Sequence, residues 1–196
     1  PVTSSNIDRK MSGPKAGIGT YYSQIFKMIN GEYTAISSKK DFNLKPLEKG
    51  ALKGSSNTEV VAFWNDVYNL RVKAYELSDE IKNSKKEIDK IIKSYQQAKT
   101  TNTALEKRIY NIRDGFNKLD IQLNGSKSRS SIGEQNDYPS MWTYLWSANG
   151  SGNSTYGPTD THKQSYSSAK SIFFEINAEF KILEKQIDAV KNGLKK

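Results

Sequence analysis

Apolar residues recur every three or four positions along most of the chain after residue 56, which is the spacing of one face of an α-helix. The first stripe continues for about five heptads, with Ser84 in place of an apolar residue at one seam position. Two further stripes follow, separated by polar segments. The pattern predicts three long helices with the apolar positions Val60, Phe63, Val67, Leu70, Ala74, Leu77, Ile81, Ile88, Ile91 and Tyr95; Leu105, Ile109, Ile112, Phe116, Leu119 and Leu123; and Tyr166, Ala169, Phe173, Ile176, Phe180, Leu183, Ile187, Val190 and Leu194.

The ends of these helices carry their own signals. Ser56 and Glu59 have the spacing of a capping box, in which the serine hydroxyl and the glutamate carboxylate accept hydrogen bonds from exposed backbone N–H groups. Thr103 and Glu106 repeat this spacing before the second stripe, and the pair Asn124–Gly125 suits the end of that helix. The first two helices are therefore expected to begin at these capping residues and the second to end near residue 124.

Three heptad helices joined by short connections pack most economically as an up-down-up bundle, because each buries its stripe against the other two. We therefore predict a mainly α fold: an elongated, coiled-coil-like antiparallel three-helix bundle with a short extra helix, preceded by a small β-hairpin or partial β-sandwich. Residues 1–50 form the β segment and residues 56–196 the helical bundle. At 1.5 Å per residue, the first helix would be about 60 Å long.

The segment before the bundle alternates in the manner of β-strands. A strand from Tyr21 to Met28 leads to Asn30–Gly31, the dipeptide that most readily forms a type I′ hairpin turn. A second strand is expected from Tyr33 to Ile36, and a third, short one around Phe42 and Leu44. So few strands cannot bury a core alone, so they either pack on the helices or belong to a β-sandwich whose other strands lie upstream of Pro1.

The connections after the second helix are less regular. Residues 126–137 are polar and predict a loop, and Pro139 suits the first turn of a short helix that ends at Asn149–Gly150. Residues 151–157 are rich in Gly, Ser and Asn and predict a second loop. The last long helix is expected to begin near Thr159 or Thr161.

Aromatic side chains cluster in and around this short helix. As a candidate site they could stack on sugar rings or peptide groups of a partner, whereas the simpler interpretation is a hydrophobic lid on the end of the bundle. In the lid interpretation Trp142 and Trp146, four residues apart, face the bundle while Tyr144 turns away. The candidate binding residues are Tyr138, Trp142, Tyr144, Trp146 and Tyr156.

Composition narrows the possible chemistry. The chain has 196 residues, a formal net charge of +9, no cysteine and a mean hydropathy of -0.74, which favours helices with much exposed surface. Without cysteine, disulfides, thiolate metal sites and cysteine nucleophiles are excluded. The basic residues are spread along the chain and interleaved with acidic ones, so we expect no nucleic-acid partner. No apolar stretch is long enough for a membrane span.

The sequence gives only weak signals for catalytic residues. The neighbouring carboxylates Asp79–Glu80 and the nearby pair Glu87 and Asp89 point to different faces of a helix beside lysines, so we interpret them as solvated charges. His162, the only histidine, lies at the start of the last helix, where a capping or surface role is expected rather than a catalytic one. We expect no catalytic residue, no metal site and no cofactor.

Several segments, taken in order and with their spacing, resemble a known family. They are the strand with Gly19–Tyr21, its partner ending in residues 42–46, the paired long helices, and Gly157–Thr159 leading through Gln164 and Tyr166 into the last helix. Together they resemble, over about residues 14–196, the C-terminal region of large secreted bacterial proteins with a sortilin-like, BNR-repeat β-propeller, usually described as glycosyl hydrolases of Bacteroidetes.

The resemblance implies a secreted or cell-envelope bacterial protein whose propeller lies upstream of this chain. The chain itself contains no Asp-box repeat, so the resemblance places hydrolase activity on none of its residues. We therefore expect a non-catalytic C-terminal scaffold or docking module whose partner is the upstream propeller. The alternative is a glycan- or protein-binding module that uses the aromatic cluster at residues 138–156.

Overall fold

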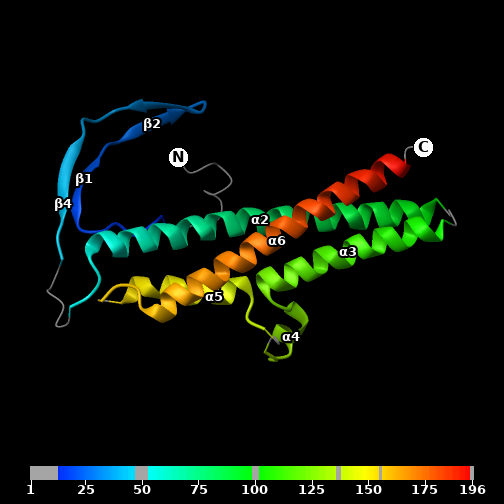
Figure 1. Ribbon diagram of the computed structural model, residues 1–196. Helices are drawn as coiled ribbons and strands as arrows, with labels where there is room; N and C mark the ends of the chain where they lie inside the picture. Colours follow the sequence, from blue (N-terminus) through cyan, green and yellow to red (C-terminus); the bar gives the residue numbers. More distant parts are fainter. Residues whose placement is uncertain (1–12, 47–52, 99–101, 136–137, 155, 195–196) are drawn as a thin grey trace.

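The computed structural model describes residues 13–46, 53–98, 102–135, 138–154 and 156–194. Within these residues, four strands are followed by helices of very different lengths (Figure 1). The strands are β1 (Gly19–Ser23), β2 (Phe26–Ile29), β3 (Glu32–Ala35) and β4 (Lys40–Leu44); the helices are α2 (Asn57–Gln97), α3 (Thr103–Asn124), α4 (Lys127–Ser131), α5 (Met141–Asn149), the 3-10 helix η1 (Gly150–Asn153) and α6 (Asp160–Leu194).

The long helices α2, α3 and α6 pack on one another in up-down-up order, with α3 antiparallel to the other two (Figure 1). The helix α2 has 41 residues, whereas α3 has 22 and leaves part of α2 and α6 uncovered. The short helix α5 packs on both and covers this part. The predicted fold class is confirmed: a mainly α, elongated antiparallel three-helix bundle with a short extra helix, preceded by a small β segment.

The apolar stripes form one continuous core along the bundle. Ser84 is buried at its seam position, and Phe116 meets Phe180 edge to face with ring centroids 6.0 Å apart. Ile92 is also buried although it lies outside the predicted stripe, and the side chain of Leu194 lies outside the described residues. Four seam residues pack against this core while only partly buried: Phe63, Leu105, Tyr166 and Leu183. Val60, at the start of α2, is also only partly buried.

The helix starts confirm one predicted cap and correct another. Ser56 caps α2 in the predicted capping box, donating its backbone N–H to Glu59 and accepting the Glu59 N–H on its hydroxyl. The predicted Thr103 cap of α3 is wrong, because the side chain of Asn102 accepts the N–H of Leu105 and Thr103 is already helical. At the N-cap, Asn is preferred at least as strongly as Thr. The cap therefore lies one residue earlier than predicted, at Asn102.

The end of α3 agrees with expectation, but the segment after it differs. As predicted, α3 ends at Asn124, and Gly125 follows with φ +84°, a value that favours glycine. The predicted loop over residues 126–137 instead begins with the helix α4, which the Ser126 side chain caps. The predicted position of Pro139 inside the next helix is wrong, because Ser140 is the N-cap and accepts the Thr143 N–H.

The predicted loop after α5 begins as the 3-10 helix η1, with the Ser151 side chain buried. The last helix begins at Asp160, as expected from Thr159. Thr159 and His162 cap each other: the Thr159 N–H donates to the His162 Nδ1 at 3.1 Å, and the His162 N–H to the Thr159 hydroxyl at 3.4 Å. The capping role predicted for His162 is therefore confirmed.

The four strands form a curved two-stranded β-arm, defined here as residues 19–44. At its base β1 pairs antiparallel with β4, and at its tip β2 pairs with β3. The turn at the tip has positive φ at Asn30 and Gly31 (+51° and +86°), as predicted for type I′. The single strand predicted from Tyr21 to Met28 is divided at residues 24–25, where the side chains of Gln24 and Ser37 take over the cross-strand hydrogen bonds.

The β-arm is attached to the start of α2 and then curves over that helix (Figure 1). Asn57 holds its base: the Ile18 N–H donates to the Asn57 side-chain oxygen at 3.1 Å, and the Asn57 amide donates to the Ile18 carbonyl at 3.0 Å. No side chain of the four strands is fully buried. The first alternative for the strands, that they pack on the helices, is therefore not observed, because none of their side chains is buried there.

Candidate interaction surfaces

Large apolar side chains are exposed along the β-arm. Their exposed fractions lie between 45% and 68%, although residues of these types are usually buried. Apolar patches of this kind on a folded domain mark sites of interaction. The exposed residues in and next to the β-arm are Ile18, Tyr22, Ile25, Phe26, Met28, Ile29, Tyr33, Ile36 and Phe42.

The strand register places many of these residues on one face. Directly paired residues of antiparallel strands point to the same side, and alternate residues along a strand share a side. At the tip, Phe26 is opposite Ala35 and Met28 is opposite Tyr33, so all four side chains share one face. The other face there carries Lys27, Thr34, Ile29 and Glu32 and is mixed. The tip therefore has one apolar face and one amphipathic face.

The base of the β-arm repeats the arrangement. Tyr21 is opposite Phe42, and their rings stack with centroids 6.0 Å apart. The neighbouring pairs on the other face are Thr20 with Asn43 and Tyr22 with Asp41. Each sheet has two strands, so every strand of the β-arm is an edge strand with one row of backbone groups outside the ladder. An apolar face with open edges can receive a further strand or a second sheet.

The predicted aromatic site is only partly assembled. Trp142 is half-buried and lies between Tyr75 of α2, at 4.6 Å between ring centroids, and Trp146, at 6.1 Å. Trp146 is 54% exposed, so the expectation that both tryptophans are buried is wrong. Tyr144, expected to turn outward, packs against the core instead. We call Tyr75, Trp142 and Trp146 the aromatic row.

The orientation of α5 explains this outcome. Its buried residues are Met141, Leu145 and Ala148, which share a face at the spacing i, i+4, i+7. The two tryptophans are each one position further along, so they lie on the flank of that face. The sequence predicts that Trp142 and Trp146 cover the end of the bundle, but Met141 and Leu145 are the side chains buried there.

The remaining predicted residues lie elsewhere. Tyr138 precedes α5 and is 83% exposed, whereas Tyr156 follows η1 and is 43% exposed. The carbonyl of Tyr156 accepts the N–H of Ser55 at 2.9 Å, so its segment is bound to the start of α2. Tyr75 was missed by the sequence reasoning; the available signal was an aromatic residue directly beside the seam position Ala74.

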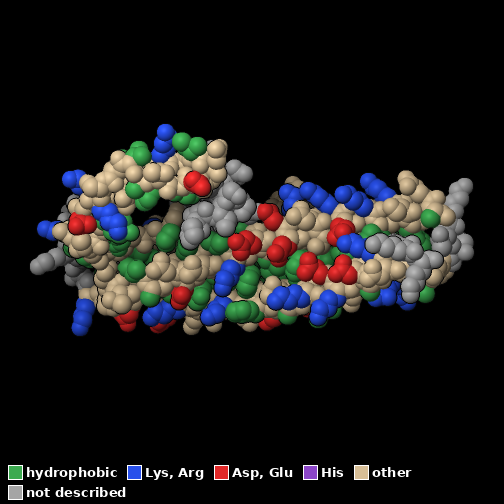
Figure 2. Space-filling model, turned by 90° about the horizontal axis from the view of Figure 1, so that it is seen from above, with side chains coloured by type: hydrophobic (Ala, Val, Ile, Leu, Met, Phe, Trp, Pro, Cys, Tyr) green, Lys and Arg blue, Asp and Glu red, His purple; other side chains and the backbone are tan. Residues whose placement is uncertain are grey.

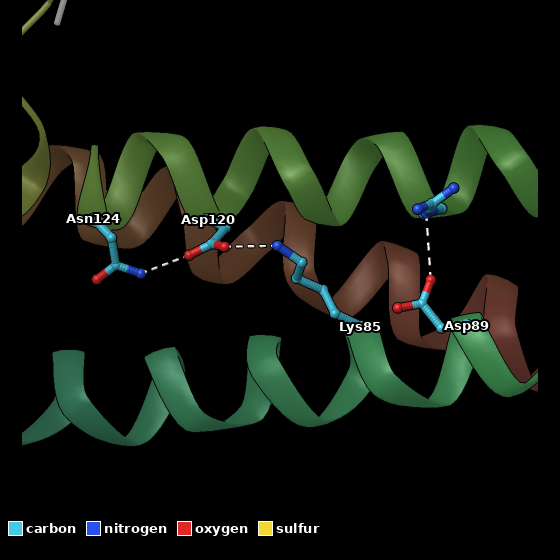
Figure 3. Close-up of polar contacts among 5 residues, drawn as sticks. Lys85, Asp89, Asp120 and Asn124 are labelled. Atoms are coloured by element: carbon cyan, nitrogen blue, oxygen red, sulfur yellow. Dashed lines mark hydrogen bonds and ion pairs between the residues drawn. The ribbon is translucent and has the colours of Figure 1, made fainter. Parts of the chain in front are cut away.

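Two carboxylates, Asp120 and Asp89, belong to ion pairs between α2 and α3 (Figure 3). Lys85 of α2 donates to the Asp120 carboxylate of α3 at 2.6 Å, and the Asn124 amide donates to the other oxygen at 2.7 Å. Burial raises the pKa of Asp120, but these hydrogen bonds outweigh it and hold the pKa below its usual value. Asp89 pairs with Arg113 of α3 at 3.3 Å.

A second set of charged groups joins α2 to α6. Glu87 pairs with Lys191, and its hydrogen bond raises the pKa of that lysine. Glu80 has a raised pKa because of burial and the nearby carboxylates of Glu184 and Glu76. The interpretation of Glu87 and Asp89 as merely solvated charges is therefore incomplete, because both join helices.

The charge distribution over the visible face of the bundle is mixed: Figure 2 shows Lys and Arg side chains interspersed with Asp and Glu. Among the described residues, no three His, Asp or Glu side chains converge as metal ligands would. Within the described helices, no stretch is long and apolar enough to cross a bilayer.

No family model matches the chain, and comparisons with curated proteins and with solved structures return no similar protein.

Proposed function

We propose that this chain is a non-catalytic scaffold and docking module, in which the helical bundle presents the β-arm to a protein partner. One observation carries the proposal: side chains such as Phe26, Met28 and Tyr33 are at least half exposed on a single face of the arm. The bundle supplies a rigid base, because Asn57 at the start of α2 holds the arm through two hydrogen bonds.

The β-arm on its own has little to stabilise it. An isolated two-stranded ribbon is marginally stable in water, and covering apolar surface gains about 25 cal/mol per Å². A partner with a β-sheet fits best, because sheets pack face to face through apolar side chains and open strand edges can pair. The arm therefore gains both packing and hydrogen bonds in such a complex.

The resemblance found in the sequence supplies the identity of the proposed partner. In the proposal the arm docks on β-structure of a sortilin-like propeller protein exported to the envelope or surface of a bacterium. The chain contributes position and stability to that protein, and the reaction, if the propeller has one, takes place elsewhere.

Site-specific photo-crosslinking tests this proposal. A photoreactive phenylalanine analogue replaces Phe26 on the arm or, as a matched control, Phe174, an exposed aromatic residue on the bundle that is 58% exposed. After irradiation in the bacterial host, we expect peptides of a propeller protein crosslinked at position 26 and not at position 174. Equal crosslinking at both positions, or crosslinks at 26 to no β-structured partner, would contradict the proposal.

A second candidate is a glycan- or protein-binding module. The observation that favours it is the aromatic row, where Trp146 is 54% exposed and its ring lies beside that of Trp142, which in turn lies beside Tyr75. Exposed aromatic rings of this kind stack on sugars. Binding to a glycan array that Trp146→Ala abolishes and Phe174→Ala leaves intact would favour this candidate over the arm.

A further inference from the structure

A pocket of about 100 Å³ lies between the segment before β1, the helix α2 and the turn η1. None of the described residues that line it belongs to the β-arm, so it is separate from the proposed docking surface. Gly13 and Pro14 form one wall, and Val67 and Tyr68 of α2 form another. The polar groups that line it are Lys15, Trp64, Arg71, Asn149 and Ser151.

Lys15 forms the rim of the pocket. Its ammonium group donates to the Gly152 carbonyl at 2.5 Å and lies 5.7 Å from the centre of the Trp64 ring. A Cβ atom at residue 152 would lie only 2.6 Å from the Lys15 Nζ, so glycine permits this close approach. The lysine thus joins the start of the chain to η1, 137 positions away in the sequence.

Two hydrogen-bond donors at the pocket have no partner among the described residues. The Ser151 side chain is 1% exposed and its hydroxyl makes no hydrogen bond, and the Trp64 indole N–H is likewise buried without an acceptor. Buried polar groups are nearly always hydrogen-bonded in native proteins, so such a pair indicates that an acceptor is supplied from outside the chain.

The charge of the pocket indicates what that acceptor is. Lys15 and Arg71 both contribute cations, and no Asp or Glu is among the described residues that line the pocket. Cations with N–H and O–H donors and no carboxylate complement an anion with several acceptor oxygens. We propose that this pocket binds a small oxyanion, a carboxylate or phosphate group, held by Lys15, Arg71, Ser151 and Trp64.

NMR spectroscopy of the whole chain tests the proposal directly. The indole N–H signals of the tryptophans are followed while inorganic phosphate or acetate is added at constant ionic strength, with Trp64→Phe assigning the relevant signal. We expect a saturable shift of the Trp64 signal and little change at Trp142 and Trp146. Saturation by both anions assigns the site to small oxyanions in general, saturation by acetate alone assigns it to carboxylates, and saturation by phosphate alone assigns it to phosphate groups.

Variants separate the pocket from general charge effects. Lys15→Gln is expected to weaken binding at least tenfold, and Ser151→Ala, which leaves the Lys15 contact in place, to weaken it severalfold. Lys185→Gln removes an equal charge from an exposed position on α6 and is expected to change nothing. Absence of a saturable Trp64 shift, or equal affinities for the Ser151→Ala and Lys185→Gln variants, would overturn the proposal.

Discussion

At the scale of single residues, the contrast between Leu145 and Trp146 tests how α5 is oriented. Leu145 is 1% exposed and Trp146 is 54% exposed, although they are neighbours in sequence. Leu145→Ala is expected to lower the free energy of unfolding by about 2–5 kcal/mol, as buried leucines do. Trp146→Ala leaves no cavity and is expected to cost about 1 kcal/mol or less. Urea denaturation measures both, and a larger loss for Trp146 would show that the tryptophan faces the core.

Glu80 is a residue whose charge opposes folding. Its pKa is raised in the fold by burial and by two neighbouring carboxylates, so the folded chain binds the proton more tightly than the unfolded chain. The associated stability is fully present below the unfolded pKa of about 4.3 and is lost as the pH rises through the folded pKa. Glu80→Gln is therefore expected to raise the melting temperature at pH 7.

The pH dependence supplies the check for Glu80. The difference in melting temperature between Glu80→Gln and the unmodified protein should shrink as the pH falls below the unfolded pKa of about 4.3, because Glu80 is then protonated in the folded and the unfolded chain. Glu179→Gln, at an exposed position of α6, is the matched control. A difference that does not change with pH, or one equal to that of the control, would show that Glu80 is not perturbed.

At the scale of elements, the ion pair between Lys85 and Asp120 holds α2 and α3 in register. The Asp120 pKa is lowered in the fold, so its stabilisation is present above the unfolded pKa of about 3.9 and is lost as the pH falls through the folded pKa. A double-mutant cycle with Lys85→Met and Asp120→Asn is expected to give a coupling of about 1 kcal/mol at pH 7.

The neighbouring pair Arg113 and Asp89 provides the control for this cycle. Both side chains are about half exposed, at 46% and 52%, whereas those of Lys85 and Asp120 are 29% and 22% exposed. Solvent screening should reduce the coupling of the exposed pair to about zero. Equal coupling of the two pairs, or a Lys85 and Asp120 coupling that persists unchanged near pH 2, would contradict the stabilising role of this ion pair.

Elements with long periodic stripes were predictable from the sequence, and short ones were not. The stripe of α3 specifies the buried face because six residues repeat it, and all but Leu105 are fully buried. In α5, six of the nine residues are apolar or aromatic and they lie on several faces, so periodicity alone could not decide between Trp142 and Leu145. The buried face of α5 is set by its packing against α2 and α6, which are distant in sequence, so the sequence of α5 alone does not show it.

At the scale of the whole molecule, the bundle is the part that the sequence determines most firmly. Ile81 and Phe180 are 1% and 3% exposed on different helices of the bundle. Replacing either with Asp buries a charge at a cost of several kcal/mol and is expected to unfold the bundle. Ile182→Asp, at a position of α6 that is 57% exposed, is expected to leave the melting curve nearly unchanged.

Circular dichroism at 222 nm distinguishes these variants. Loss of helical signal for Ile81→Asp and Phe180→Asp, with a normal melt for Ile182→Asp, is the expected result. A normal melt of either seam variant would mean that its helix does not bury the assigned stripe.

The candidate surfaces were harder to predict than the bundle, because they depend on contacts between distant segments. The sequence indicates Asn30–Gly31 as a turn, but the exposure of the β-arm follows only from its position relative to α2. The oxyanion pocket likewise depends on Lys15 reaching Gly152, a contact that no local pattern records. The aromatic residues from 138 to 156 are close in sequence, yet the fold separates Tyr138 and Tyr156 from the aromatic row.

Hydrogen exchange measured by mass spectrometry tests the central claim most directly. The chain is measured alone and in complex with the propeller protein that the crosslinks at position 26 identify. Complex formation is expected to slow exchange in the β-arm, residues 19–44, while α5 and the aromatic row exchange at the same rate in both samples. Protection centred on α5, or a β-arm whose exchange is unaffected by the partner, would contradict the claim that the arm is the docking surface.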